Sequence, residues 1–292
     1  MNNMTHPQIY VSSACSSRRT IIAAVEELVH FGFRNIELTG GTIFYRDYEG
    51  DLLRLQEKYG LNYLVHNYFP PSQQEFVLNL ASVDSELGQK TFQHLKRGLE
   101  LTSTLGADRF GFHAGFFVDP SISELGGALG PRSINSPELS LATFCERFSK
   151  LSQEAGDIEL YLENNVYAHS TYKTYGKTVP FMLLSFNDYL NLRSMIDFKL
   201  LLDLGHLKVT IRSLGLDFRE EATNMVNASD YIHISDNDGL HDQNHAIRKG
   251  GGLYQCLQES DMARKLFTLE IYDGMDEVSE SHGLILSLIE SQ

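Results

Sequence analysis

The chain has 292 residues, of which 42% are hydrophobic and 21% charged. This composition is typical of a globular protein with a sizeable core and argues against intrinsic disorder. The formal net charge of −14 argues against broad electrostatic binding of nucleic acid and leaves room only for a small local basic groove. Because α/β barrels routinely exceed about 250 residues as one unit, residues 1–292 are predicted to form a single domain.

Three cysteines, Cys15, Cys145 and Cys256, are widely spaced and odd in number. They predict neither a disulfide framework nor a cysteine-based zinc site, and they suggest a reducing environment. The first residues lack a basic segment followed by an apolar one, and no stretch approaches about 18 consecutive apolar residues. The sequence therefore predicts a cytoplasmic protein with no export signal and no membrane span.

Short apolar runs alternate along the chain with longer segments of helical periodicity. This alternation is the pattern of strand–helix units around a parallel sheet. Eight such units are predicted, which favours an α/β fold consisting of a single (β/α)8 TIM barrel. The expected strands, in chain order, are residues 8–13, 34–40, 62–68, 109–115, 158–164, 199–205, 230–236 and 266–272.

The clearest helix candidates are residues 18–32, 47–60 and 84–106, where leucine and phenylalanine recur every three or four positions. Each candidate ends in glycine, the residue that most readily takes the left-handed conformation of a helix C-terminus. An open doubly wound sheet is the alternative fold. It rarely carries eight evenly spaced units without a glycine-rich phosphate turn after the first strand, and this sequence has no such turn.

Two segments that directly follow predicted strands, residues 116–140 and 166–185, are too long for minimal connections. In a barrel, long βα loops rise above the C-terminal face, where substrate-covering segments lie. We interpret both segments as lids over that face. The alternative is that they are ordinary surface excursions, since loop length alone says little about function.

Polar side chains lie near the ends of six successive predicted strands. They are His66, His113, Glu163, Asp203, His233 and Glu270. A barrel gathers the C-terminal ends of its strands around one mouth, so these side chains are expected to converge. Taken singly, each is most simply a hydrogen-bonded polar group. Three clustered carboxylates, however, raise one another's pKa values and destabilise the fold unless a divalent cation offsets their charge, so the pattern predicts a metal site.

The predicted ligands combine carboxylates and imidazoles, a mixture that suits zinc, manganese, iron or cobalt better than calcium. The lack of nearby cysteine argues against a closed structural zinc site. Glu163, Asp203, His233 and Glu270 form a four-ligand set that leaves coordination positions open for substrate oxygens. The site is therefore predicted to be catalytic.

Further histidines follow the predicted ligands. His206, three residues after Asp203, is interpreted either as an additional ligand or as a group that orients a substrate hydroxyl. Asp238, His241 and His245 lie in one loop and either extend the metal site or are ordinary solvated loop residues.

Other residues are candidates for substrate binding. Glu37 faces the mouth if its strand is assigned correctly, and Asn67 directly follows His66. Arg248 and Lys249 precede three glycines, which allow close backbone approach to a phosphate, although this motif is weak.

Taken together, the pattern resembles the xylose isomerase-like TIM-barrel superfamily, which includes sugar epimerases, inosose dehydratases and the apurinic endonuclease IV family. The matching segments cover nearly the whole chain and are VHNYF, LNLAS, FHAG, LENN, LDLGH, IHISD and LEIY. For the sugar epimerases, the resemblance implies that Glu163, Asp203, His233 and Glu270 bind one metal. It also implies that Glu163 and Glu270 flank the substrate as acid and base.

The endonuclease branch binds three zinc ions with a larger ligand set. Its additional histidines resemble His66, His113, His206 and His245, so the expected metal content is one to three ions per chain. That branch has an aspartate two residues before the histidine matched to His245, where this sequence has Gln243. This difference argues against the third metal position, whereas His66 and His113 exceed what a single sugar-binding metal requires.

Three hypotheses follow. The first is a metal-dependent isomerase or epimerase of a sugar, sugar phosphate or related polyol, in which Glu163 and Glu270 transfer a proton through an enediolate. The second is a zinc-dependent phosphodiester hydrolase of the endonuclease IV type. The third is a non-catalytic barrel that uses a vestigial site for binding. The first is preferred, with a small carbohydrate-type molecule as the partner.

Overall fold

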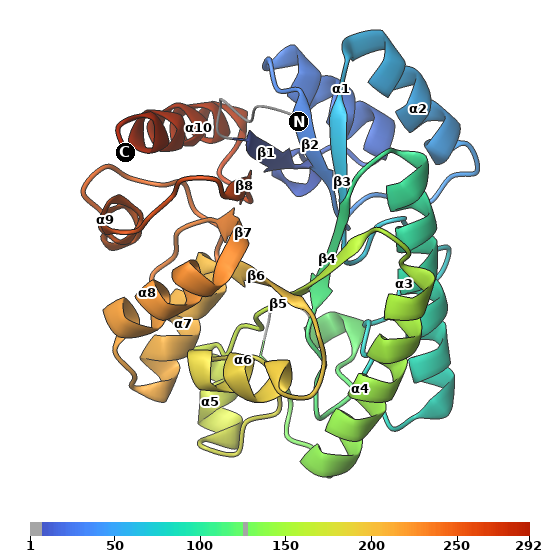
Figure 1. Ribbon diagram of the computed structural model, residues 1–292, viewed down its shortest axis with the longest axis vertical. Helices are drawn as coiled ribbons and strands as arrows, with labels where there is room; N and C mark the ends of the chain where they lie inside the picture. Colours follow the sequence, from blue (N-terminus) through green and yellow to red (C-terminus); the bar gives the residue numbers. More distant parts are fainter. Residues whose placement is uncertain (1–7, 125–127) are drawn as a thin grey trace.

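Eight parallel strands close into a barrel in the computed structural model, which describes residues 8–124 and 128–292 (Figure 1). Each strand pairs with its neighbours in chain order, and β1 pairs with β8 to complete the ring. The strands are β1 (Gln8–Ser12), β2 (Asn35–Leu38), β3 (Asn62–His66), β4 (Arg109–His113), β5 (Glu159–Glu163), β6 (Lys199–Asp203), β7 (Ser229–Ile234) and β8 (Leu266–Leu269). The predicted (β/α)8 TIM-barrel fold is confirmed.

Helices surround the barrel and cover the outer faces of its strands (Figure 1). They are α1 (Ile21–His30), α2 (Tyr48–Tyr59), α3 (Ser85–Thr104), α4 (Pro137–Glu154), α5 (His169–Tyr175), α6 (Phe186–Arg193), α7 (Leu204–Leu214), α8 (Phe218–Ala228), α9 (Gly252–Glu259) and α10 (Met275–Glu290). Two short 3-10 helices, Ser13–Cys15 and Ile122–Glu124, lie in loops. None of the helices in the described ranges is both long and apolar enough to cross a membrane.

The three predicted helices form, within a few residues of their expected bounds. The side chain of Asp84 accepts hydrogen bonds from the first free backbone amides of α3, which fixes the start of that helix. Gly60 ends α2 in the left-handed conformation, at φ 64°, as its position in the sequence predicts. Local capping residues therefore explain where these helices begin and end.

All eight predicted strands are present, but each ends one to three residues earlier than predicted. The reason is visible at two strand ends. Asn67 has a φ of 43°, which turns the chain away from β3. Asp203 is both the last residue of β6 and the N-cap of α7. Polar residues at the mouth belong to these turns, where strand pairing stops.

The interior of the barrel is filled by a separate layer of side chains. The layer consists of Tyr10, Leu64, Tyr161, Leu201, Tyr231 and Leu266, all buried. Alternate residues of a strand point to the same side, so the residue two positions beyond each of these also faces the interior. Leu64, Tyr161, Leu201 and Tyr231 thus precede His66, Glu163, Asp203 and His233 by two residues. The apolar layer forms a floor beneath the polar strand ends.

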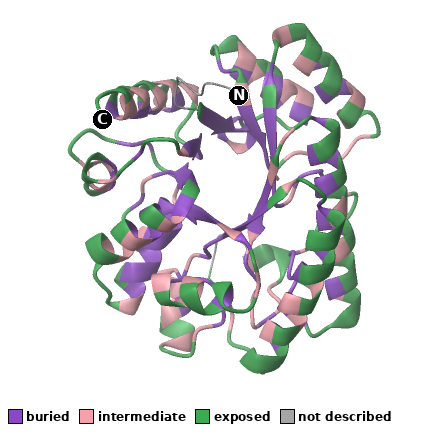
Figure 2. Ribbon diagram, in the orientation of Figure 1, coloured by how far each residue is buried: buried purple, intermediate pink, exposed green. Residues whose placement is uncertain are grey.

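The burial pattern agrees with this arrangement, because the strands are buried and the outward faces of the helices are exposed (Figure 2). The larger hydrophobic cluster extends from Ile9 to Leu288 and packs the helices onto the barrel. The two ends of the described chain therefore contribute to one core.

The two long segments predicted as lids contact each other. Phe116 and Phe181 form an isolated antiparallel bridge, and their rings lie 5.4 Å apart. The amide of Phe117 donates to the carbonyl of Pro180 at 2.8 Å. Each predicted segment is shortened by a helix, since α4 begins at Pro137 and α5 lies within 166–185. Residues 125–127 of the first segment lie outside the described residues, and a lid function remains a prediction.

Candidate metal centre

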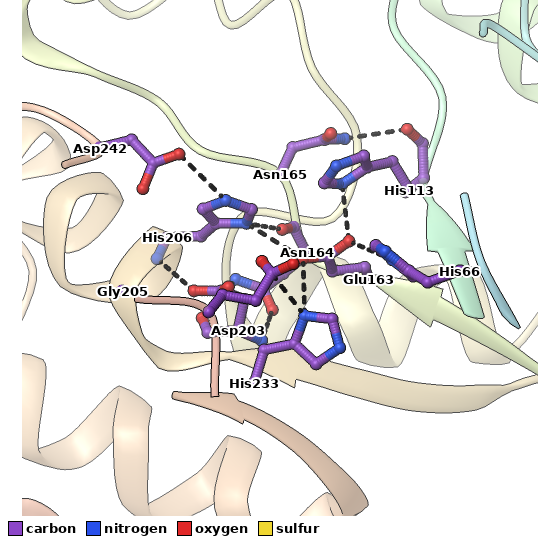
Figure 3. Close-up of polar contacts among 12 residues, drawn as sticks. His66, His113, Glu163, Asn164, Asn165, Asp203, Gly205, His206, His233 and Asp242 are labelled. Carbon is purple, nitrogen blue, oxygen red and sulfur yellow. Dashed lines mark hydrogen bonds and ion pairs between the residues drawn. The ribbon is translucent and has the colours of Figure 1, made fainter. Parts of the chain in front are cut away.

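The six polar strand-end residues gather in one cluster at the C-terminal ends of the strands. Figure 3 labels all of them except Glu270. Strand register explains part of this proximity. His113 pairs with Glu163 between β4 and β5, and Asp203 pairs with His233 between β6 and β7. The expected convergence of strand ends is therefore present.

Glu163 lies at the centre of the cluster and is 1% exposed. Its Oε2 atom is 2.9 Å from Nε2 of His66 and 3.0 Å from Nδ1 of His113. Its Oε1 atom is 3.5 Å from Nδ1 of His206 and 3.7 Å from Nδ1 of His233. The two carboxylate oxygens therefore face two different pairs of imidazoles.

A second donor group lies on the Oε1 side of Glu163. Asp203, His233 and Glu270 each offer a ligand atom, and these atoms lie within 4.8 Å of one another. Nδ1 of His233 is 3.6 Å from Oε2 of Glu270. Because all three residues are buried, the group is shielded from bulk water.

Several buried ligand atoms of the cluster have no hydrogen-bond partner among the described residues. They are Nδ1 of His113, Oε1 of Glu163, Oδ2 of Asp203 and Nδ1 of His233. Oδ1 of Asp203 accepts a hydrogen bond from the backbone amide of His206 at 2.7 Å. This bond holds the carboxylate in place and leaves Oδ2 without a partner among the described residues. A buried polar atom without a partner is costly. Carboxylate and imidazole donors left free in this way fit a divalent transition metal.

Protonation of the cluster reflects a balance between burial and charge. Burial alone would raise the pKa of Glu163, but His113 and His66 outweigh it and hold the pKa well below its usual range. Burial likewise opposes ionisation of Glu270, yet His233 lowers its pKa to about 2. Burial and the charge of Glu163 raise the pKa of Asp203 to about 7. Two of the three carboxylates are thus ionised at neutral pH, and Asp203 gains most from a nearby cation.

His206 joins the cluster together with a residue that the sequence analysis missed. Its Nδ1 atom is 3.0 Å from the carbonyl oxygen of Asn164, and its Nε2 atom is 3.3 Å from Oδ2 of Asp242 (Figure 3). The endonuclease pattern has an aspartate at the position where this sequence has Gln243. Asp242, one residue earlier, brings a carboxylate to His206, so the loop keeps an acid near this histidine.

His245 and Arg248 do not join the cluster. Nδ1 of His245 lies 2.9 Å from Asp273, and its side chain is 49% exposed. Arg248 forms an ion pair with Glu277 of α10 at 2.9 Å, and its side chain is 61% exposed. The groups of potential metal ligands in the described part of the chain do not include His245. The ion pair with Glu277 directs the Arg248 side chain toward α10.

Asp238 and His241 form a local pair in the same loop, at 2.9 Å, with both side chains exposed. This geometry matches the alternative in which they are solvated loop residues.

Glu37 and Asn67, the other predicted substrate contacts, are both buried. Oε2 of Glu37 accepts hydrogen bonds from the hydroxyls of Tyr231 and Thr268 beneath the polar cluster. The backbone of Asn67 is held on both sides, since its amide donates to the carbonyl of Gly111 and its carbonyl lies 3.3 Å from Nε2 of His94. These contacts favour a supporting role for both residues.

Comparison with known proteins places the chain in a family. Residues 25–285 match the family described as xylose isomerase-like TIM barrel. The chain belongs to the xylose isomerase-like TIM-barrel family. Among curated proteins, no sequence matches it.

Solved structures with the same fold are distant in sequence. A D-tagatose 3-epimerase-like protein is 17% identical with a TM-score of 0.72, and the match covers 97% of each chain. The D-psicose 3-epimerase of Clostridium cellulolyticum, solved with D-tagatose, is 11% identical with a TM-score of 0.64, covering 97% of this chain and 96% of that one. Endonuclease IV from Thermus thermophilus is 16% identical with a TM-score of 0.61, covering 98% and 100%. These likenesses establish the fold of this xylose isomerase-like protein.

Metal removal is expected to destabilise this xylose isomerase-like barrel. Free metal at about 1,000 times its dissociation constant stabilises a folded protein by roughly 4 kcal/mol. For a chain of this size, that corresponds to a rise in Tm of about 8 °C. Thermal melts with Mn²⁺, Co²⁺ or Zn²⁺ and with excess chelator measure the difference. Identical melts under all conditions would contradict metal binding by the cluster.

Acid is expected to destabilise the protein through His94, which supports Asn67 next to the cluster. Burial lowers the pKa of His94 to about 4, from an ordinary value of 6.5. Between these values the unfolded chain binds a proton that the folded chain does not, so stability is complete above pH 6.5 and falls as the pH decreases. The expected loss is about 1.4 kcal/mol per pH unit.

Urea denaturation at pH 7 and pH 5 measures this loss. Because other groups also titrate, the comparison is between the wild type and His94→Gln, which lacks the titrating imidazole. The variant should lose less stability between the two pH values. An equal loss in both proteins would show that His94 is not the responsible group.

Proposed function

We propose that the protein is a divalent-metal-dependent isomerase or epimerase that acts on a sugar, sugar phosphate or related polyol. The observation that carries the proposal is the arrangement of two buried glutamates around one imidazole nitrogen. Nδ1 of His233 is 3.7 Å from Oε1 of Glu163 and 3.6 Å from Oε2 of Glu270. Two carboxylates so close together offer two groups for moving a proton on and off a substrate carbon.

The histidines around the two glutamates favour their ionised forms. His113 and His66 keep the pKa of Glu163 low against the effect of burial, and His233 lowers that of Glu270 to about 2. Both side chains are therefore charged at neutral pH and able to accept a proton. In epimerisation, one carboxylate would remove the proton next to a carbonyl, and the other would take up a proton from solvent and deliver it to the opposite face of the carbon.

The metal would be held by Glu163, Asp203, His233 and Glu270, and the first three each have a buried ligand atom with no hydrogen-bond partner among the described residues. When bound, a divalent metal supplies Lewis-acid polarisation of a substrate carbonyl. Burial of the ligands keeps water from the carboxylates, which protects a reactive carbanion-like state from uncontrolled protonation. His206, 7% exposed above the cluster, is a candidate for orienting a substrate hydroxyl.

The similarity to epimerase structures supports this choice among the reactions that the family fold accommodates. The net charge of −14 argues against an acidic polymer as the substrate. The two-glutamate geometry therefore carries the argument.

Two measurements test the proposal. Metal analysis of protein purified without chelator should find at least one divalent ion per chain. Incubation in deuterated water with a panel of ketoses, in the presence of that ion, should place deuterium at the carbon next to the carbonyl, as detected by NMR. Protein that contains metal but catalyses no exchange with any ketose or ketose phosphate would contradict an isomerase and leave a binding function.

A zinc-dependent phosphodiester hydrolase is the second candidate, favoured by one observation. His66 and His113 face Oε2 of Glu163 at 2.9 and 3.0 Å, so this carboxylate has a second imidazole pair on the side away from His233. Hydrolysis of phosphodiesters commonly uses two metals that share a carboxylate. Two or three zinc ions per chain, with cleavage of a DNA duplex at an abasic site, would favour this function over the first.

A further inference from the structure

A buried glutamate outside the donor groups assigned above contacts one of the metal ligands from below. Glu37 lies on β2 and is fully buried. By strand register it pairs with Leu64, which belongs to the apolar layer inside the barrel. The carboxylate therefore lies deeper than His66, which is two residues closer to the mouth.

Two hydroxyl groups fix the orientation of Glu37. Tyr231 donates to its Oε2 atom, and the Thr268 hydroxyl donates to the same atom at 2.9 Å. Both donors are buried on the strands β7 and β8. A buried carboxylate held by two hydroxyls has little freedom to move toward the mouth.

The third partner of Glu37 is the imidazole of His233, which is fully buried. Nε2 of His233 is 3.0 Å from Oε1 and 3.2 Å from Oε2 of Glu37. A carboxylate accepts hydrogen bonds, so Nε2 must carry a proton to interact favourably with it. A metal-bound imidazole is neutral and has only one N–H, so with Nε2 protonated Nδ1 is the nitrogen that offers a lone pair. Nδ1 is also the atom that faces Glu163 and Glu270.

We propose that Glu37 is a positioning residue that fixes the Nε2–H form of His233 and thereby presents Nδ1 to a divalent metal. The inference rests on the proposed function, because it concerns a ligand of the proposed metal. Histidine ligands of metals commonly donate their second N–H to a carboxylate, which fixes the ring and makes the ligand nitrogen more basic.

An alternative is that Glu37 is itself a ligand, together with His66 and Glu270, whose potential ligand atoms lie within 4.8 Å of its own. The contacts of His66 argue against this. Its Nε2 atom faces Glu163 at 2.9 Å, whereas Glu37 is 3.9 Å from the opposite nitrogen, Nδ1. Glu37 and Glu163 therefore face opposite nitrogens of the His66 ring, so His66 cannot offer one lone pair to an ion shared with both carboxylates.

The first test measures metal affinity directly. Co²⁺ is titrated into metal-free protein in competition with a chromophoric chelator, for the wild type and for Glu37→Gln. Loss of an outer partner typically weakens metal binding by about 10- to 100-fold. We expect a loss in this range, with the protein still folded by circular dichroism. An affinity within about twofold of the wild type would overturn the inference.

The matched control is Asp51→Asn. Asp51 is also a buried carboxylate, and it accepts a hydrogen bond from a tyrosine, Tyr45, but it lies on α2 and contacts none of the cluster. This variant should bind Co²⁺ as the wild type does. If Glu37→Gln does not fold, Thr268→Val replaces it, because this variant removes one donor to Glu37 and leaves the carboxylate. A loss of Co²⁺ affinity in Thr268→Val without a loss in Asp51→Asn supports the inference, and equal affinities overturn it.

The second test identifies the protonated nitrogen. In Zn²⁺-loaded, ¹⁵N-labelled protein, imidazole correlation spectra should show a protonated Nε2 and an unprotonated Nδ1 for His233, assigned by its absence in His233→Asn. A protonated Nδ1, which would leave Nε2 for the metal, overturns the inference. Wild-type protein that binds no divalent ion would instead refute the proposed function itself, and the two failures are thereby distinguishable.

Discussion

Glutamine at position 163 is expected to remove bound metal and proton exchange together. The oxygens of Glu163 face His66 and His113 on one side and His206 and His233 on the other. Both donor groups therefore depend on this carboxylate. The variant loses the negative charge and places an amide N–H₂ group against at least one imidazole pair. We expect metal affinity to fall by about 100-fold or more and exchange by about 1,000-fold or more.

Metal content after gel filtration and the rate of deuterium incorporation measure the two effects. Glu154→Gln is the matched control, because Glu154 lies on α4 and forms an exposed ion pair with Lys96. Exposed pairs of this kind contribute little, so the control should keep wild-type metal content and activity. A Glu163→Gln protein that keeps its metal and its exchange rate would show that Glu163 is not the centre of the site.

The barrel and the clustering of polar strand ends could be predicted because both depend on simple periodicity. Eight apolar runs of strand length were sufficient for the fold. Residues two apart on a strand face the same side, so a polar residue after an apolar strand predicts a side chain at the mouth. Glu163 and Asp203 follow Tyr161 and Leu201 in this way, and both lie in the cluster.

The position of a side chain along the barrel axis could not be predicted with the same accuracy. Glu37 was expected near substrate because it lies toward the end of a predicted strand. The shear of the barrel, however, pairs Glu37 with Leu64, so the carboxylate lies below the ligands. Strand register depends on all eight strands together and is not encoded in any one segment.

The loop after β7 was the least predictable part of the site. Loops lack the periodicity that reveals which side chains point inward. Asp242 reaches His206 and was not predicted, whereas His245 was predicted as a ligand and instead pairs with Asp273. The acid that lies against His206 is therefore at position 242, one residue before the position that the family pattern indicates.

Glu270→Gln is expected to separate catalysis from metal binding. Glu270 takes part with Asp203 and His233 in one donor group, whereas His66 and His113 face Oε2 of Glu163 without it. The variant keeps Glu163, Asp203 and His233 of the proposed ligand set and loses the carboxylate proposed as acid or base. Proton transfer by a positioned group contributes about 100- to 10,000-fold to a rate.

We expect kcat for exchange to fall within that range while some bound metal remains. Glu159→Gln, a change at the opposite end of β5, is the control and should exchange normally. Wild-type exchange in Glu270→Gln would exclude this residue as acid or base. If Glu163 and Glu270 act as one unit, the double variant should be little slower than Glu163→Gln alone, because residues that act together have non-additive effects. Additive losses would instead indicate that the two glutamates serve separate steps.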